Sequence, residues 1–142
     1  MAASHTENHG CNTRLRRNHR ILVVDDDRML RRMFERILRG RCDVVSVESA
    51  DAARDILEGD PGFDTVLCDV NLTGMSGIDF HHWLAIDNPE LAGRMLFITG
   101  GVFTEDARRF LEEIPERCLG KPLDKGDLFE AIDSVLPEDA RN

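Results

Sequence analysis

The sequence predicts an α/β fold in which a doubly wound sheet of five parallel strands is joined by helices. Short apolar runs alternate along the chain with longer stretches in which apolar residues recur at helical spacing. Apolar runs of this length are typical of strands that are buried on both faces. Because strand–helix–strand connections are right-handed, this alternation predicts a parallel sheet covered by helices on both sides.

Each expected strand is a short apolar run that ends in polar residues or glycine. We expect strands at residues 21–24, 44–47, 65–68, 95–98 and 118–120. Runs of four to eight such residues bounded by turn-forming residues are the usual signature of strands. Residues 59–62, with the sequence Gly-Asp-Pro-Gly, form one of these turns.

Five helices are expected, one after each strand. The first carries an apolar stripe with arginines over the rest of its surface, and Gly40 ends it. Ser49 and Thr104 are good N-caps for the second and fourth helices, and the third is expected over residues 78–87. The apolar stripe of the first helix consists of Leu30, Met33, Phe34, Ile37 and Leu38, and that of the last helix consists of Leu128, Ile132, Val135 and Leu136.

Length and charge limit the classes of protein to which the chain can belong. Its 142 residues are enough for one domain, and a formal net charge of −9 argues against nucleic acid as a direct partner. No apolar stretch approaches the roughly 20 residues of a membrane span, so we expect a cytoplasmic protein without a membrane partner. Residues 1–20 carry four arginines and one acid, whereas the rest carries 14 basic and 26 acidic residues. We expect a basic, disordered tail at residues 1–19, one domain at 20–137 and a C-terminal tail at 138–142.

Polar side chains follow four of the five strands. Asp25 and Asp26 follow the first, Asp69 the third, Thr99 the fourth and Lys121 the fifth. In open α/β sheets, ligands bind outside the carboxyl ends of the strands, so these groups are expected to share one crevice. Acids that would repel one another need a cation between them, and a lysine beside them needs an anion. The set indicates a divalent metal with a phosphoryl group.

These residues stand within motifs that resemble the receiver domain of two-component response regulators. The motifs are V-V-D-D-D, D-x-N-L-x-G-M-S-G, I-T-G and L-G-K-P, which follow one another over residues 20–137. The stretches around Thr99 and Lys121 look most like receivers of hybrid sensor histidine kinases. The resemblance implies a flavodoxin-like sheet with strand order 2-1-3-4-5, for which a receiver protein is itself a standard example. It also implies a signalling phosphoacceptor rather than an enzyme, with self-phosphorylation and autodephosphorylation at most.

The resemblance assigns a role to each residue of the crevice. Asp69 would take a phosphoryl group from the phosphohistidine of a sensor histidine kinase or a histidine phosphotransfer domain. Asp26 would bind Mg²⁺ directly, with Mn²⁺ as an alternative, and Asp25 would act largely through water. Asp69 itself and the backbone carbonyl of Asn71 would complete the metal site.

Two further residues would bind the phosphoryl group. Thr99 would donate a hydrogen bond to one phosphoryl oxygen and Lys121 would pair with another, with Lys121 aimed by a cis peptide before Pro122. The chain departs from the family at Cys118, where many receivers carry an aromatic switch residue, and at Thr73, where a proline is usual. We expect these changes to affect how the signal leaves the domain and how mobile the loop after Asp69 is.

Other interpretations of the same residues are open. Taken singly, each could be structural, as a helix cap, a turn residue or a solvated charge. The run 69–73 resembles the D-x-D-x-T signature of haloacid-dehalogenase phosphatases, although Asn71 stands where that chemistry needs an acid. A docking pseudo-receiver that is never phosphorylated is another alternative. For a kinase partner, we hypothesise docking through the arginine-rich first helix, including Arg31 and Arg32. The sequence leaves open whether the chain forms a homodimer.

Overall fold

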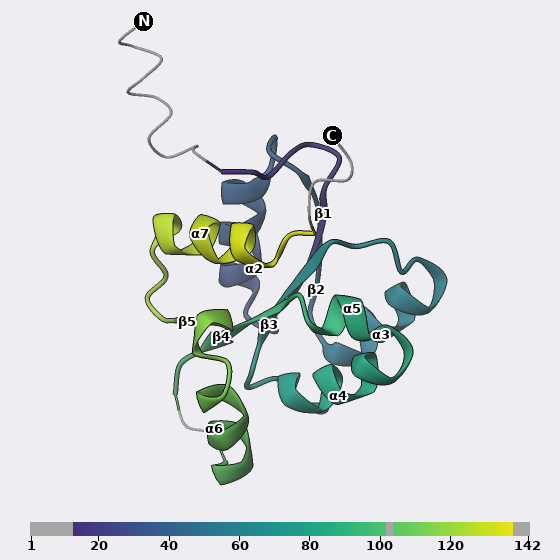
Figure 1. The fold of residues 1–142 in the computed structure, drawn as a ribbon, viewed down its shortest axis with the longest axis vertical. Coiled ribbons are helices and arrows are strands. Elements are labelled where there is room, and N and C mark those ends of the chain that lie inside the picture. Colours follow the sequence, from purple (N-terminus) through teal and green to yellow (C-terminus); the bar gives the residue numbers. More distant parts are fainter. Residues whose placement is uncertain (1–12, 102–103, 138–142) are drawn as a thin grey trace, which may run out of the picture.

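A computed structural model describes residues 13–101 and 104–137, and its central feature is a sheet of five parallel strands in the order β2-β1-β3-β4-β5 (Figure 1). This order confirms the doubly wound, flavodoxin-like sheet. The strands begin and end within one residue of the predicted positions. They are β1 (Arg20–Val24), β2 (Asp43–Val47), β3 (Thr65–Asp69), β4 (Met95–Thr99) and β5 (Cys118–Gly120).

Helices cover both faces of the sheet. α2 (Arg28–Leu38) and α7 (Lys125–Val135) pack on one face, whereas α3, α4, α5 and α6 pack on the other (Figure 1). The helices of the second face are α3 (Ala50–Gly59), α4 (Gly77–Asp87), α5 (Pro89–Ala92) and α6 (Glu105–Glu112), and a short 3-10 helix, η1 (Pro115–Arg117), precedes β5. No helix in the described part of the chain is long and apolar enough to cross a membrane.

The described residues form six α-helices rather than the five predicted, because a further short helix, α5, follows α4. Asn88 ends α4 and also caps α5, since its side-chain oxygen accepts a hydrogen bond from the backbone N–H of Leu91 at 3.2 Å. Pro89 occupies the first turn of α5, where its missing N–H costs no hydrogen bond. The predicted caps at Ser49 and Thr104 are confirmed, with each side chain accepting from the N–H three residues later.

Alternating side chains of the central strands form the core on the two faces. In β1, Ile21 and Val23 face α2 and α7, whereas Leu22 and Val24 face α3 and α4, and all four are fully buried. Burial on both faces explains why the strands appear in the sequence as continuous apolar runs. It also leaves the polar residues that follow each strand at the rim of the sheet.

The segment before β1 has defined contacts with α7. Leu15 is only 6% exposed and belongs to the core on the α2–α7 face. The side chain of Thr13 and the backbone N–H of Arg14 both donate to the carboxylate of Asp133, and the Arg14 guanidinium donates to the carbonyls of Asp133 and Leu136. Residues 13–15, which were predicted to lie in the N-terminal tail, thus contact the domain. Residues 1–12 and 138–142 lie outside the described residues.

Candidate functional site

Three aspartates meet at the carboxyl ends of β1 and β3. These neighbouring parallel strands pair Val24 with Cys68, so the residues that follow come to the same edge of the sheet. One carboxylate oxygen from each of Asp25, Asp26 and Asp69 lies within 4.8 Å of the others. Asp25 is 1% exposed and Asp69 5%, whereas Asp26 is open to solvent. Two buried acids and one exposed acid therefore face one another across the strand ends.

The carboxylate of Asp25 is only half satisfied. Its Oδ1 accepts a hydrogen bond from the backbone N–H of Asp27 at 2.8 Å, but its Oδ2 is buried without a partner among the described residues. The pKa of Asp25 is raised to about 6, mainly by burial and in smaller part by the charge of Asp69, although the hydrogen bond from the Asp27 N–H lowers it. A buried carboxylate oxygen without a donor is costly, so a cation beside it would be stabilising.

Asp69 is held between two donors. The backbone N–H of Asn71 donates to Oδ1 at 2.9 Å, and Nζ of Lys121 lies 3.5 Å from Oδ2. Lys121 comes from the end of β5, and the peptide that joins it to Pro122 is cis, as the resemblance implied. The lysine stem passes close to Gly100, where an added Cβ would lie 3.0 Å from the lysine Cδ.

Thr99 and Asn71 complete the surroundings of Asp69. The hydroxyl of Thr99 is 3.4 Å from the carbonyl of Leu119, a long contact that leaves the hydroxyl able to turn toward a ligand. The side-chain amide of Asn71 donates to the carbonyl of Gly100 at 3.1 Å, which ties the loop after β3 to the end of β4. Every site residue predicted from the sequence therefore lies at this one edge of the sheet.

Two contacts at the site were not anticipated from the sequence. The backbone N–H and the hydroxyl of Thr73 both donate to Oδ2 of Asp26, at 3.3 and 3.1 Å. The sequence does contain a signal for this contact. Position 73 usually carries proline in the family, and proline has no backbone N–H, whereas threonine has one to donate. Arg31 is the second case, since its guanidinium donates to the backbone carbonyl of Asp25 at 2.8 Å.

Gly77, at the start of α4, has a steric role beside Asp69. A Cβ at this position would lie 2.4 Å from the backbone carbonyl oxygen of Asp69, closer than side chains pack. The glycine in the M-S-G motif therefore lets the first turn of α4 approach the end of β3. The backbone N–H of Gly77 also donates to the carbonyl of Val70 at 3.0 Å.

The donor set fits a small divalent cation. Carboxylate oxygens are the ligands that Mg²⁺ prefers, and the unpartnered oxygen of Asp25 lies in the same cluster as Asp26 and Asp69. Opposite these acids, Lys121 can pair with an anion and Thr99 can donate to one. An acidic edge with one lysine can thus hold a cation and an anion such as a phosphoryl group next to a buried carboxylate.

The parallel sheet and its acidic edge define an α/β domain with a candidate site for a cation and an anion. The family of response regulator receiver domains matches residues 21–133, and the chain belongs to this family. A protein-glutamate methylesterase/protein-glutamine glutaminase of Burkholderia thailandensis is 42% identical over 113 residues, which are 73% of this chain and 30% of that protein. The chain spans less than a third of that enzyme, whose name describes the longer protein.

Other relatives agree with this assignment. A two-component response regulator of Arabidopsis thaliana is 27% identical over 119 residues, which are 82% of each chain. A response regulator receiver protein of Pseudomonas putida has a similar structure, with a TM-score of 0.72, 24% identity and coverage of 82% of this chain and 97% of that one. A receiver domain of Clostridium thermocellum gives a TM-score of 0.70 at 23% identity, covering 83% and 94%. The latter two likenesses show the fold, and the family match places the chain in two-component signalling.

Proposed function

We propose that Asp69 accepts a phosphoryl group from the phosphohistidine of a sensor histidine kinase or histidine phosphotransfer domain. An oxygen of Asp69 attacks phosphorus, the phosphorus–nitrogen bond of the phosphohistidine breaks, and the imidazole leaves with its electron pair and takes up a proton. The product is an aspartyl phosphate. The observation that carries the proposal is the buried Asp69 carboxylate, which lies between the Lys121 ammonium and two further acids.

The residues around Asp69 suit this transfer. Asp25, Asp26, Asp69 and the Asn71 carbonyl would hold Mg²⁺, which when bound supplies positive charge to the phosphoryl oxygens. Lys121 pairs with another phosphoryl oxygen. Its ammonium group, which contacts the Asp69 carboxylate, reaches the phosphoryl group on Asp69 by a small movement of the flexible lysine side chain. The Thr99 hydroxyl, held by a long contact alone, donates to a third oxygen.

The phosphatase alternative lacks its general acid. That chemistry requires a second carboxyl group two residues after the nucleophile to protonate the leaving group. The side chain at this position is the amide of Asn71, which donates to the carbonyl of Gly100. The geometry therefore favours an acceptor that keeps its phosphoryl group over an enzyme that turns over phosphate esters.

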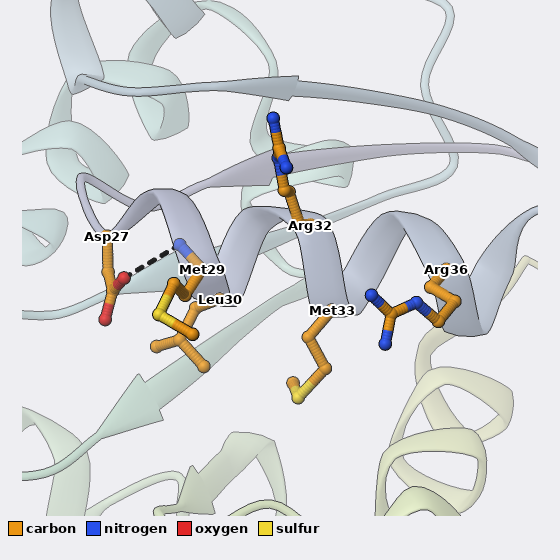
Figure 2. A pocket seen from close by; sticks show the side chains of 6 residues that line it. All are labelled: Asp27, Met29, Leu30, Arg32, Met33 and Arg36. Carbon is orange, nitrogen blue, oxygen red and sulfur yellow. Dashed lines mark hydrogen bonds between the residues drawn. The ribbon is translucent and has the colours of Figure 1, made fainter.

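The surface of α2 supports docking of a helical phosphodonor. A groove along this helix is lined by apolar and basic side chains together, and Figure 2 shows Met29, Leu30 and Met33 projecting from the same side of the helix. Met29 is 79% exposed, and methionine adapts well to an apolar partner surface. Arg32 and Arg36 also line the groove and would attract an acidic partner. The groove begins at Asp27, next to Asp26, so a partner bound there lies beside the acidic edge.

The structure changes which arginines test this docking. Arg31 holds the backbone of Asp25, so its charge reversal would disturb the acidic edge as well as any interface. Arg32→Glu with Arg36→Glu is the better variant. We expect slower phosphotransfer from a phosphorylated histidine phosphotransfer domain but unchanged labelling by acetyl phosphate, which needs no docking. Equal loss with both donors would contradict the docking surface.

Labelling of the full chain by acetyl phosphate tests the acceptor itself. We expect Mg²⁺-dependent incorporation of one phosphoryl group per chain, detected by intact-mass spectrometry, and none in Asp69→Asn. Asp79→Asn is the matched control, because it makes the same change at another acid, in the first turn of α4. Label that persists in Asp69→Asn would move the acceptor elsewhere. Sustained turnover of p-nitrophenyl phosphate would support the phosphatase instead.

A further inference from the structure

The third acid of the site, Asp26, is held differently from the other two. Asp25 and Asp69 are fixed by burial and by backbone N–H donors two residues further along the chain. Asp26 is exposed, and its carboxylate is held by a residue from another loop. Oδ2 of Asp26 accepts from the hydroxyl of Thr73 at 3.1 Å and from the backbone N–H of Thr73 at 3.3 Å.

This contact joins two loops that leave neighbouring strands. Asp26 lies between β1 and α2, and Thr73 lies between β3 and α4. An exposed carboxylate without donors samples several rotamers, and ordering it costs free energy when a ligand binds. Two donors on one oxygen reduce this freedom before the ligand arrives. A proline at position 73 would provide neither the N–H nor the hydroxyl, so the contact belongs to the residue that this chain carries.

We propose that Thr73 is a positioning residue for the divalent cation, which it affects by orienting Asp26. The proposal rests on the proposed function, since it takes the acidic edge as a Mg²⁺ site. One oxygen of Asp26 lies within 4.8 Å of oxygens of Asp25 and Asp69 while Thr73 holds Oδ2. Hydrogen-bond donors behind a metal-binding carboxylate orient it, and their removal typically weakens metal binding by about 10- to 100-fold.

Whether Thr73 raises or lowers the affinity for Mg²⁺ depends on the type of hydrogen-bond donor. A hydroxyl and an amide N–H are neutral, so they leave the negative charge of Asp26 available to a cation. A lysine or arginine in the same place would compete with the cation directly. Thr73 therefore increases affinity for Mg²⁺ by reducing the ordering cost. Because the N–H donor remains after loss of the hydroxyl, we expect the hydroxyl alone to contribute about threefold to tenfold in affinity.

Magnesium titrations by isothermal calorimetry test this role on the full chain after treatment with EDTA. Thr73→Val removes the hydroxyl while keeping the shape and the backbone N–H, and Thr73→Ser restores the hydroxyl without the methyl group. We expect the Mg²⁺ dissociation constant to rise about threefold to tenfold in Thr73→Val and to stay within about twofold in Thr73→Ser. Thr73→Ala removes the same hydroxyl with no added bulk. If Thr73→Val does not fold, the titration is repeated with Thr73→Ala.

Two further measurements separate the possible failures. Thermal unfolding in EDTA should be the same for the chain and for its Val and Ser variants, because the role concerns the cation and not the fold. Asp26→Asn should bind Mg²⁺ much more weakly than the chain; equal binding by these two would overturn the metal site of the proposed function. Two outcomes would overturn the role of Thr73 alone. In the first, the unmodified chain and Thr73→Val bind Mg²⁺ with equal affinity; in the second, Thr73→Val and Thr73→Ser weaken Mg²⁺ binding equally.

Discussion

The two ends of the central sheet each gather three aspartates beside a cation, yet the carboxylates are held differently at the two ends. The carboxyl-end acids are Asp25, Asp26 and Asp69, and the amino-end acids are Asp43, Asp60 and Asp64. Both sets are brought together by loops and strand ends that are distant in the sequence. A count of acids would not tell the two ends apart.

At the amino end, Arg20 neutralises its neighbours. Its guanidinium makes a two-pronged contact with Asp60 at 2.8 and 2.9 Å and a further contact with Asp43 at 3.2 Å. Its backbone N–H donates to Asp64, and its guanidinium lies 4.2 Å from the centre of the Phe63 ring. The hydrogen bond from Arg20 lowers the pKa of Asp60, as expected for a carboxylate paired with a cation.

At the carboxyl end, the cation contacts a single acid and from a longer distance. Lys121 is the one cation in a salt bridge with these acids among the described residues, at 3.5 Å from Asp69. Burial raises the pKa of Asp25, and one of its oxygens has no donor in the part of the chain that the structure describes. Each end has a cation, so the comparison teaches that the candidate site is distinguished by its buried carboxylate oxygen without a donor among the described residues. Arg20 stabilises the fold at the amino end, whereas the buried charge of Asp25 lowers the stability of the fold at the carboxyl end.

The largest expected effect comes from removing the buried charge at the carboxyl end. Asp25→Asn keeps the shape of the side chain, and in EDTA at neutral pH it should stabilise the protein. Asp25 ionises with a pKa of about 6 in the fold against an ordinary value of 3.8. The difference of about two pKa units corresponds to roughly 2 to 3 kcal/mol in the free energy of unfolding. Urea denaturation measures this gain.

The pH dependence of that gain identifies its cause. A raised pKa means that the folded state binds its proton more tightly than the unfolded state. The cost of Asp25 is therefore absent below about pH 4, grows as the pH rises, and is complete above about pH 6. The advantage of Asp25→Asn should follow the same course. An advantage of equal size at pH 3.5 and pH 7.5 would show that charge at the carboxyl end is not responsible.

Removing the cation at the amino end should have the opposite sign and a smaller size. Arg20→Met keeps an apolar stem against Phe63 but leaves Asp43 and Asp60 without their partner. Partly exposed ion pairs contribute about 0.2 to 1 kcal/mol each, and a cation over an aromatic ring adds about 0.5 to 1 kcal/mol. We expect a loss of about 1 to 2 kcal/mol in urea denaturation. A stabilised Arg20→Met would remove the contrast between the two ends.

Much of the carboxyl end could be predicted from the sequence because the chain marks it locally. Each buried strand is a continuous apolar run, so the first polar residue after it lies at the rim, as Asp25 and Asp69 do. The parallel arrangement then brings the ends of neighbouring strands together without further information. The caps at Ser49 and Thr104 were predicted correctly from residue type and position, whereas the strand order was predicted from the family resemblance. The chemical roles of the site residues stay predictions.

The contacts that were missed depend on loops whose paths the sequence does not mark. Nothing local to Thr73 indicates that its hydroxyl lies against Asp26, since the partner is distant in the chain and the loop that carries Thr73 has no periodic pattern. Leu15 is a single apolar residue among arginines, so its burial against the α2–α7 face had no pattern to support it. α5 was missed because four residues are too short to show helical periodicity.

The smallest expected effect separates the two acids that share Arg20. Asp43→Asn removes an exposed carboxylate that meets Arg20 through one nitrogen, whereas Asp60 remains in its two-pronged contact. The loss should be below about 0.5 kcal/mol, because exposed single contacts are weak and one negative charge fewer also relieves repulsion in a chain of net charge −9. Asp60→Asn, the matched variant, should cost more, and the difference between the two should shrink in 0.5 M NaCl as screening increases. If Asp43→Asn cost as much as Arg20→Met, the stability of the amino end would depend on that single pair and not on a shared cation.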